Sequence, residues 1–437
     1  MLDSVIRRFG FWMADFVKGG NIRKAYKDIK KIMNLPYEDM RKIQVRYEMN
    51  LINHAKETTA YYANTLAGIS KLEDCPVIDK NILKENYEAF QSYKYKNEKK
   101  HYMSTSGSTG TPFTIIQDMR KRSRVLAELI YFNEKVNNNI GDKFIFFRVW
   151  TVNNRESKLK FWMKNEIPID ILHFTDENFE KIRKVLKTKK NVKVLLGYVS
   201  TFEYLANYLE KQGDTRTDFN IKTIITGSEI QTKETRRRLE ELFGCNVVSR
   251  YANEENGVIA HQCISSEEFH VNSANYRVEI LKLDSNEVAD YGELGRVVVT
   301  DLFNYAFPLI RYDTGDLAIK NKKSECGWGS EVISNVQGRR VDLIYDTKGN
   351  ALSPHTWSVY MWNFNKLKQY QFIQEEEKKY VLKVNGAEGY YSDSTLINYL
   401  KGILGNDAQI IIEHVNDIPL LKSGKFKKTV CNWHPDN

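Results

Sequence analysis

The spacing of apolar residues changes along the chain and separates regions of different structure. Near the N-terminus, apolar residues recur every three or four positions, which predicts amphipathic helices at residues 24–33 and 41–66. Farther on, short apolar runs alternate with amphipathic stretches. The runs predict strands at 143–150, 192–198, 221–227 and 245–251, and the stretches predict helices at 178–188, 201–211 and 232–244. This alternation is typical of parallel strands joined by helical crossovers, where ligands bind beyond the carboxyl ends of the strands.

The second half of the chain is richer in strands and ends in a separate unit. Strands are predicted at 276–283, 295–302, 316–321 and 340–346, followed by a hairpin at 369–384, a helix at 393–404 and a strand at 409–415. The sequence therefore predicts an α/β protein with mixed or parallel sheets and helices in a large N-terminal domain, plus a small α+β C-terminal domain. The predicted bounds are 1–95 for a helical N-terminal region of the large domain, 96–338 for its core and 339–437 for the small domain.

Length, composition and charge exclude several classes of protein. At 437 residues the chain is long enough for two or more domains, and 42% hydrophobic with 28% charged residues is an ordinary globular composition. The net charge of +9 is modest and the basic residues are scattered, which argues against a nucleic-acid partner. No apolar run approaches the roughly 20 residues that span a bilayer. Five cysteines, an odd count, do not indicate a disulfide framework and favour a reducing cytoplasm.

The first twenty residues are not those of a secretory signal peptide. Asp3, Arg7 and Arg8 interrupt the apolar stretch that such a signal needs. An amphipathic helix that packs on the body of the protein is the favoured interpretation. Peripheral membrane docking is the second interpretation, and the residues that would carry it are Phe9, Phe11, Trp12 and Phe16.

The segment "STSGSTGTPF" is dense in serine, threonine and glycine and stands before a predicted strand. Gly107 and Gly110 allow close backbone approach, and successive N–H groups with hydroxyl donors can form a concave anion site. The segment differs from the Walker pattern, because it contains no lysine and does not open a helix. Taken alone, it is compatible with a phosphate-binding loop or with a flexible linker.

Further motifs follow this segment in a fixed order. They are "TGSE" (226–229), "RYANEENG" (250–257), "PLIRYDTGD" (308–316), "QGRRVD" (337–342) and "PLLKSGKFKK" (419–428). In this order and spacing, the chain resembles the adenylate-forming ligase superfamily from about residue 50 to about residue 430. The closer similarity is to the phenylacetate–CoA ligase family and its relatives in capsule biosynthesis.

The resemblance implies a two-step reaction. A carboxylic acid and ATP form an acyl-adenylate and release pyrophosphate, the small domain rotates, and the acyl group passes to an acceptor. The acceptor is implied to be CoA or an amine or hydroxyl in surface-polysaccharide modification, and ATP and Mg²⁺ are implied cofactors. A second class stays open: a catalytically inactive nucleotide-binding protein, or a membrane-associated scaffold of polysaccharide assembly. The joint presence of Lys425, Asp316 and Glu255 argues against that class.

The resemblance also implies which residues hold the nucleotide. Tyr251 is expected to stack on adenine, Asp316 to accept hydrogen bonds from the ribose, and Arg339 to contact ribose or phosphate. Arg311, beside this motif, is expected to form a structural ion pair. The full predicted nucleotide site is Ser104, Thr105, Ser106, Gly107, Ser108, Thr109, Gly110, Gly227, Ser228, Glu229, Tyr251, Asp316 and Arg339.

Two residues are implied to act on the reacting groups. Lys425 in the small domain is expected to reach the α-phosphate and the carboxylate, and Glu255 is expected to hold Mg²⁺. The chain departs from the family pattern at three places. Ala252 replaces a glycine, Glu254 replaces a threonine beside the phosphates, and Val341 replaces an acidic residue at the hinge.

Cysteine and histidine residues in two segments predict a possible zinc site. His261, Cys263 and His270 lie in "AHQCISSEEFH", and Cys326 lies in "SECGWG". Two cysteines and two histidines suit tetrahedral Zn²⁺, and such a site would be structural. Ser324 stands where relatives carry a cysteine, and His261 would supply the missing ligand. The alternative is a buried cysteine with solvated histidines.

Overall fold

The computed structural model describes most of the chain. The described residues are 2–105, 113–150, 155–322, 326, 328, 330–337, 344–352, 356–364, 366–367, 369–386, 389–418 and 428–433. Several predicted site residues therefore lie outside the described residues: Ser106, Gly107, Ser108, Thr109, Gly110, Arg339 and Lys425.

The N-terminal region consists of helices, as the apolar spacing predicts. They are α1 (Leu2–Val17), α2 (Asn21–Met33), α3 (Tyr37–Thr58) and α4 (Ala60–Thr65). The predicted helix 41–66 is broken at Thr59, which has extended backbone angles (φ −125°, ψ 140°) and accepts a hydrogen bond from the Tyr62 amide at the start of α4. Periodicity continues across this break, so the spacing of apolar residues does not reveal it.

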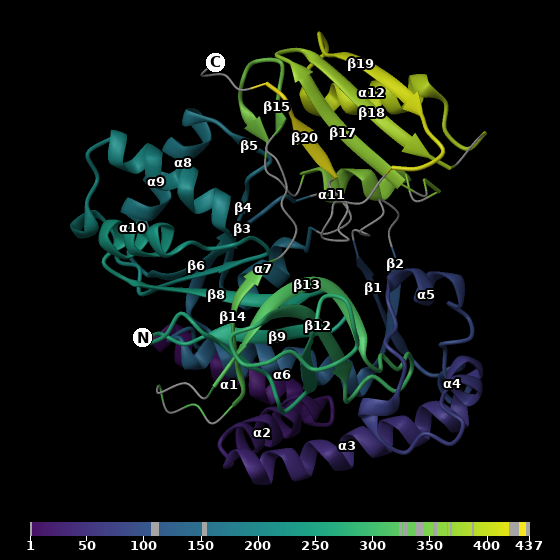
Figure 1. Ribbon diagram of the computed structural model, residues 1–437. Helices are drawn as coiled ribbons and strands as arrows, with labels where there is room; N and C mark the ends of the chain where they lie inside the picture. Colours follow the sequence, from purple (N-terminus) through teal and green to yellow (C-terminus); the bar gives the residue numbers. More distant parts are fainter. Residues whose placement is uncertain are drawn as a thin grey trace.

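A central sheet forms the body of the large domain (Figure 1). Its parallel half has the order β4 (Glu166–Asp170), β3 (Lys143–Arg148), β6 (Val192–Tyr198), β7 (Thr223–Gly227) and β8 (Asn246–Asn253). The crossover helices α8 (Asp176–Thr188), α9 (Val199–Lys211) and α10 (Lys233–Phe243) pack against it around buried residues such as Phe147 and Phe202. These elements confirm the predicted alternation of strands and helices.

The other half of the same sheet is antiparallel. Across the described residues, the sheet runs in the order β11-β12-β13-β14-β10-β9-β8-β7-β6-β3-β4. The added strands are β9 (Gly257–Gln262), β10 (Phe269–Val271), β11 (Tyr276–Leu281), β12 (Leu294–Asp301), β13 (Tyr312–Asn321) and β14 (Val332–Gln337). The predicted strand at 316–321 begins four residues earlier, so the "YDTGD" segment belongs to β13.

Smaller elements surround the sheet. A hairpin of β1 (Lys100–Thr105) and β2 (Phe113–Asp118) leads into α6 (Met119–Lys135), and α5 (Lys80–Glu85) and α7 (Lys158–Lys164) lie nearby in the large domain. Short 3₁₀ turns lie at Leu72–Asp74, Tyr93–Tyr95, Arg216–Asp218 and Met361–Phe364. None of the helices in the described ranges is long and apolar enough to cross a membrane.

The small domain is a separate α+β unit with its own core. Its strands β17 (Gln369–Glu376), β18 (Lys379–Asn385), β19 (Gln409–His414) and β20 (Thr429–Cys431) form a sheet in the order β19-β18-β17-β20, covered by α11 (Thr356–Tyr360) and α12 (Asp393–Leu404). The Trp357 ring stacks on Phe372 at 3.9 Å between centroids. The predicted hairpin, helix and strand are confirmed.

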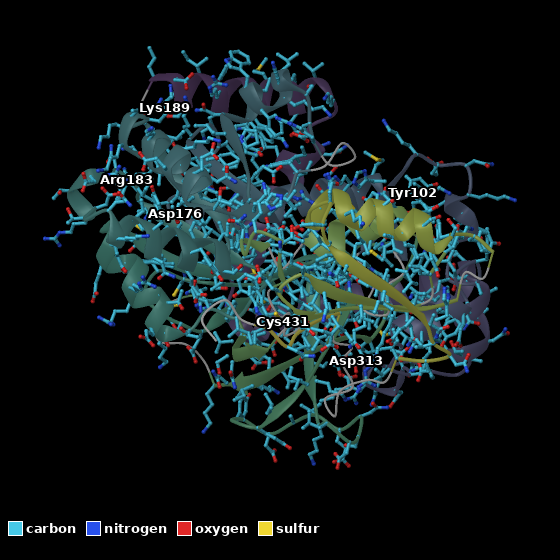
Figure 2. The ribbon with its side chains drawn as sticks, turned by 90° about the horizontal axis from the view of Figure 1, so that it is seen from above. Tyr102, Asp176, Arg183, Lys189, Asp313 and Cys431 are labelled. Carbon is cyan, nitrogen blue, oxygen red and sulfur yellow. The ribbon has the colours of Figure 1, made fainter. Side chains whose placement is uncertain are left out.

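The small domain lies over the large domain, as Figures 1 and 2 show from two directions. A short sheet joins them, because β15 (Ile344–Tyr345) pairs with β16 (Ala351–Leu352), which pairs in turn with β5 (His173–Phe174) of the large domain. The structure thus confirms the predicted α/β class with a distinct C-terminal domain. The exact bounds 1–95, 96–338 and 339–437 stay predictions.

Candidate active site

The ends of several strands open into one large cavity of about 2380 Å³. Tyr198 ends β6, Gly227 ends β7, and Tyr251 lies near the end of β8. Asp316 reaches the same cavity from the antiparallel half of the sheet. The sheet therefore gathers residues from distant parts of the sequence at the edge where parallel strands place ligands.

Tyr251 and Asp316 contact each other directly. The Tyr251 hydroxyl donates to Asp316 Oδ2 at 2.9 Å and lies 3.3 Å from Thr314 Oγ1. Burial, together with the negative charge of Asp316, raises the pKa of Tyr251 well above its ordinary value. A bulge in β13 makes this contact possible, because its register with β12 shifts and Gly315 takes a positive φ of 73°. Adenine stacking and ribose binding stay predictions.

Glu255 is buried and has a cationic neighbour that the sequence did not indicate. Lys80 Nζ, at the first turn of α5, lies 3.4 Å from Glu255 Oε1, and the Tyr312 hydroxyl donates to the same oxygen at 3.3 Å. Both Lys80 and Glu255 are less than a tenth exposed. Lys80 belongs to the segment "CPVIDKNILKENYEAF", and nothing in that segment indicates a contact with Glu255.

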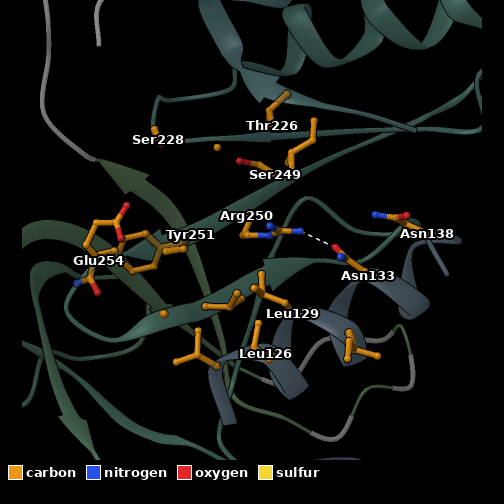
Figure 3. Close-up of a pocket in the computed structure, with 18 of the residues that line it drawn as sticks. Leu126, Leu129, Asn133, Asn138, Thr226, Ser228, Ser249, Arg250, Tyr251 and Glu254 are labelled. Carbon is orange, nitrogen blue, oxygen red and sulfur yellow. Dashed lines mark hydrogen bonds between the residues drawn. The ribbon is translucent and has the colours of Figure 1, made fainter. Parts of the chain in front are cut away.

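Glu254, the unusual neighbour of Glu255, lines the cavity (Figure 3). Burial raises the pKa of its carboxyl, the charge of Arg148 lowers it, Glu255 raises it, and Arg122 lowers it. The extra negative charge at this position thus points toward the ligand cavity and is partly offset by Arg148 and Arg122.

The "TGSE" segment forms the corner between β7 and the chain that leads to α10. Ser228 adopts a left-handed backbone conformation with φ 66°, a strained state for a residue with a side chain and a common one at functional sites. Glu229 accepts hydrogen bonds from the Ser200 amide at 2.6 Å and the Ser200 hydroxyl at 3.0 Å, at the start of α9. Gly227, Ser228 and Glu229 all line the cavity, and their contact with adenine stays a prediction.

The phosphate-loop prediction is partly within the described chain. Ser104 and Thr105 end β1, where they pair with Thr114 and Phe113 of β2. The rest of the loop lies outside the described residues. Met103 and Gln117 of the same hairpin line the cavity, so the hairpin borders it.

The small domain also contributes to the cavity. Lys428, the first described residue after the segment that contains Lys425, lines the same cavity. Its amino group lies 5.7 Å from the centre of the Tyr370 ring. The role predicted for Lys425 stays a prediction.

Arg311 is a structural residue, as expected from the sequence. Its guanidinium contacts both carboxylate oxygens of Glu279, at 3.1 and 3.2 Å, and donates to the carbonyls of Glu73 and Cys75 at 2.8 Å. The pair is buried, and it joins the N-terminal region to β11.

The inner part of the cavity is lined by α6 and β8 (Figure 3). Leu126 and Leu129 form an apolar wall, and Arg250 donates to Asn133 Oδ1 at 2.6 Å. Burial lowers the pKa of Arg250 to about 10. Sequence analysis did not single out Arg250, although it stands directly before Tyr251.

Three of the predicted zinc ligands lie together. Within the described chain, the ligand atoms of Cys263, His270 and Cys326 all lie within 4.8 Å of one another, and Cys326 Sγ is 3.1 Å from His270 Nε2. Burial lowers the pKa of His270 to about 4, so its ring is neutral and can bind a metal. Sulfur and imidazole donors at this spacing fit Zn²⁺.

His261 is not part of this group, which corrects the predicted fourth ligand. It faces His270 across the β9–β10 pair, but its ring stacks on Phe132 and its Nδ1 contacts the Gln262 carbonyl at 2.7 Å. Burial lowers the pKa of His261 to about 3. Ser324 lies outside the described residues.

Comparisons with known proteins agree with this geometry. Residues 344–432 match the family model for the CapK C-terminal domain. The chain is 24% identical to Protein CapK of Staphylococcus aureus, over 95% of this chain and 94% of that protein. It is 33% identical to phenylacetate-coenzyme A ligase of Pseudomonas putida over 116 residues, which are 26% of each chain.

A likeness to solved structures extends over most of the chain. The crystal structure of 2-hydroxyisobutyryl-CoA ligase, in complex with 2-HIB-AMP and CoA in the thioesterification state, matches with a TM-score of 0.63. The match covers 92% of each chain at 15% identity. The same ligase in its postadenylation state matches with a TM-score of 0.60. The fold is therefore that of the adenylate-forming ligases.

Proposed function

We propose that this chain, a homologue of Protein CapK and the phenylacetate-coenzyme A ligases with the fold of an adenylate-forming ligase, is an AMP-forming carboxylate ligase. In the first step, a carboxylate oxygen attacks the α-phosphorus of ATP and pyrophosphate leaves. In the second step, a nucleophile attacks the acyl carbonyl and AMP leaves. The observation that carries the proposal is the meeting of Tyr251, Glu255 and Asp316 at one cavity that Lys428 of the small domain also lines.

Each of these residues has a task that suits its chemistry. The Asp316 carboxylate accepts hydrogen bonds from the ribose hydroxyls, and its contact with Tyr251 orients it. Lys425 is proposed to arrive with the small domain and to neutralise charge between the carboxylate and the α-phosphate. Lys80 holds Glu255 in place across the cavity wall.

Magnesium fits the acidic residues of the site. Mg²⁺ is commonly held by one or two carboxylates together with phosphate oxygens, and Glu255 with Glu254 offers such a set. When bound, the ion would neutralise charge on the leaving pyrophosphate. Lys80, Arg148 and Arg122 provide further positive charge around these carboxylates.

The acceptor is proposed to be CoA, or an amine or hydroxyl in surface-polysaccharide modification. The similarity to the phenylacetate-coenzyme A ligases supports the first, and the motif resemblance to the relatives in capsule biosynthesis supports the second. These acceptors can be distinguished by isolating the protein with its acyl-adenylate bound and adding CoA, amines and sugars in turn. Only the true acceptor should take the acyl group and release AMP.

We also propose a structural Zn²⁺ at Cys263, His270 and Cys326. The ion would tie β9 and β10 to the segment before β14 and take no part in the reaction.

ATP–pyrophosphate exchange with a panel of carboxylic acids tests the ligase. Lys425→Ala should lower exchange at least about 100-fold, roughly 3 kcal/mol of barrier, while ATP binding is retained. Asp316→Ala should weaken ATP binding itself. Lys379→Ala, an exposed lysine on the hairpin of the small domain, is the matched control and should behave as the wild type.

Unchanged exchange in Lys425→Ala would refute the assignment of this lysine. If the protein binds ATP but none of the acids supports pyrophosphate exchange, it would instead be the nucleotide-binding scaffold that the sequence left open.

A further inference from the structure

Arg250 is a cation deep in the protein whose side chain faces the cavity. It stands in the centre of the sheet, between β7 and β9, and its side chain is only half-buried because the cavity adjoins it. Its Nε is buried and has no hydrogen-bond partner among the described residues, whereas the exposed part of the side chain borders the cavity. The ion pairs of the described residues include no carboxylate for Arg250. A partly desolvated guanidinium without a carboxylate partner would gain charge-assisted hydrogen bonds from an anionic ligand in the cavity.

Glu128 is the negative charge that acts on Arg250, but it does not satisfy it. The Glu128 carboxylate accepts from the Val258 amide at 2.8 Å and from Asn272 Nδ2 at 2.8 Å. Burial raises the pKa of Glu128 to about 7, so its charge is incomplete at neutral pH. The charge of Lys121, which is itself paired with Asp301 at 2.7 Å, lowers the pKa of Glu128, but less than burial raises it.

The wall around Arg250 indicates what the ligand looks like. Leu126 and Leu129 provide apolar surface, while Arg250 is fixed by Asn133 and cannot turn away without losing that bond (Figure 3). The nucleotide residues Tyr251 and Asp316 lie on the same cavity. A ligand with its reacting carboxylate at the nucleotide would extend its other end along this wall.

The geometry points to an acid that carries a second anionic group, remote from the carboxylate that is activated, with Arg250 as the residue that recognises it. The inference rests on the proposed ligase function and deepens it. A dicarboxylate or other acid with an anionic tail would form charge-assisted hydrogen bonds with the guanidinium, whereas a plain aryl tail would remove water from it and supply no such bond.

Matched pairs of acids test this specificity. Glutarate with its monoamide, adipate with its monoamide, and 4-carboxyphenylacetate with phenylacetate differ in the charge of the remote group. With the wild type, kcat/KM for exchange should be about 100-fold or more higher for the charged member of each pair. The charged member should also raise Tm more. Arg250→Gln should abolish that preference and leave ATP affinity and Tm close to the wild type, and Arg250→Lys should restore part of it.

Arg236→Gln is the matched control, because Arg236 lines the same cavity but is already paired with Glu240 at 2.9 Å. It should keep the wild-type preference. The inference is overturned if no charged acid reacts or protects, or if Arg250→Gln keeps the preference. Loss of the ligase function would appear separately, as a failure of every acid together with an Asp316→Ala variant that binds ATP normally.

A second surface, independent of the cavity's chemistry, lies on α1. Apolar residues recur along one face of this helix and are exposed, among them Phe9 at 68% and Phe16 at 72%. The full stripe is Leu2, Val5, Ile6, Phe9, Met13 and Phe16. The opposite face, with the buried Asp15, packs on the protein, so the outward stripe is not needed for that packing.

A neighbouring helix also exposes apolar residues. On α7, Leu159, Trp162 and Met163 are exposed, and the Arg7 guanidinium lies 4.7 Å from the centre of a Trp162 ring. Asn165, which follows α7, contacts Asp3 of α1 at 3.3 Å. Two segments far apart in sequence thus lie next to each other and each exposes apolar side chains; we name these two groups together the α1–α7 face.

Positive charge frames the α1–α7 face. Lys158 and Lys160 lie within α7, and Lys18 lies next to α1. Arg8 and Lys164 lie close by but are paired with Glu134 and Glu156. Apolar side chains with a tryptophan between lysines are typical of helices that lie in the interface of an anionic bilayer, and each basic residue near such a surface contributes about 1 kcal/mol. We infer that the α1–α7 face docks on anionic membranes.

Vesicle sedimentation tests this surface. The protein should bind phosphatidylcholine vesicles that contain phosphatidylglycerol and bind pure phosphatidylcholine at least about tenfold more weakly. Phe9→Ser/Phe16→Ser/Trp162→Ser should lose binding, and Lys158→Gln/Lys160→Gln/Lys164→Gln should lose the preference for anionic lipid.

Leu283→Ser/Tyr291→Ser, at exposed apolar residues elsewhere, is the control and should bind as the wild type. Sedimentation velocity without lipid tests whether a second copy of this chain binds the α1–α7 face instead. A dimer that the triple serine variant dissolves, with no vesicle binding by the wild type, would overturn the inference, and so would binding unaffected by that variant.

Discussion

Lys80 and Glu255 are separated by 175 residues and meet in the wall of the cavity. Each is a charged residue in a buried place, so neither is stable there without the other. The sequence motif identified Glu255 as a candidate, but the partner could not be predicted, because the pairing depends on how α5 packs beside β13 and not on any local pattern.

Replacing Lys80 should therefore leave the buried Glu255 carboxylate without its cationic partner, with the Tyr312 hydroxyl as a neutral donor. Lys80→Met is expected to lower the free energy of unfolding by about 3–5 kcal/mol, measured by denaturant titration. Lys84→Met, one turn later in α5, is the control and should lower it much less. Adding Glu255→Gln to Lys80→Met should recover part of the loss, and a Lys80→Met protein as stable as the wild type would show that the pair has no structural role.

Other site residues divide according to whether their signal is local. Tyr251 and Asp316 stand in recognisable motifs, and both line the cavity as a shared site requires. The hydrogen bond between them was not predictable, since it depends on the bulge in β13. His261 was expected to bind metal because of its type and position, but the orientation of its ring toward Phe132 is a packing outcome.

At the scale of elements, periodic segments were predicted well and irregular ones were not. The strand at 192–198 and the helix at 393–404 have the predicted bounds, because a strong apolar pattern begins after Asn191 in the first and lies between Ser392 and Gly405 in the second. The break at Thr59 and the short strands β5 and β16 have no such pattern. They form because tertiary contacts complete their hydrogen bonds.

Helix α6 buries Glu128, and this should make stability depend on pH. Its pKa is raised from 4.5 to about 7, so the folded state holds the proton more tightly than the unfolded state. The stabilisation of the folded state by this tighter proton binding is fully present below pH 4.5 and is lost as the pH rises through about 7. Relative to the wild type, Glu128→Gln should gain about 2–3 kcal/mol of unfolding free energy between pH 5 and pH 8.

Chemical denaturation of both proteins across this pH range measures the effect. The difference between them isolates Glu128, because other groups titrate in both. A constant difference at every pH would mean that Glu128 is ionised throughout.

The Cys263–His270–Cys326 group should behave as a metal site that joins elements. Purified protein is expected to contain about one Zn²⁺ per chain, and a chelator should lower Tm. Cys263→Ser and Cys326→Ser should each lose the metal and remove the effect of the chelator. Cys245→Ser, on a cysteine outside the group, is the control. Protein free of zinc, with a Tm that chelators leave unchanged, would refute the site.

For the whole molecule, the order of motifs predicted the fold class because each motif follows a particular strand or turn. The predicted rotation of the small domain is a different matter. In this structure β16 pairs with β5 through Leu352 with His173 and Ala351 with Phe174, so a rotation must break this short sheet. No local pattern in these segments indicates the pairing.

A disulfide across this pairing should therefore trap the protein in one arrangement. In His173→Cys/Leu352→Cys, the two Cα atoms face each other across an antiparallel pair, at a separation that permits a bond. The oxidised form should produce no more than about one equivalent of product per chain, and reduction should restore turnover. Equal turnover in both forms, with the disulfide verified by mass, would show that the small domain need not leave β5.

Helix α1 has one face toward the interior and another toward solvent. Gly10, Phe11 and Ala14 line the cavity, while Phe9 and Phe16 point outward. A ligand in the cavity and a bilayer on the outer face would both contact α1. Their binding free energies are then coupled, and this coupling is reciprocal. If a bilayer changes the affinity for the cavity ligand by some factor, the ligand must change the affinity for the bilayer by the same factor. Membrane binding would therefore depend on whether the cavity is occupied.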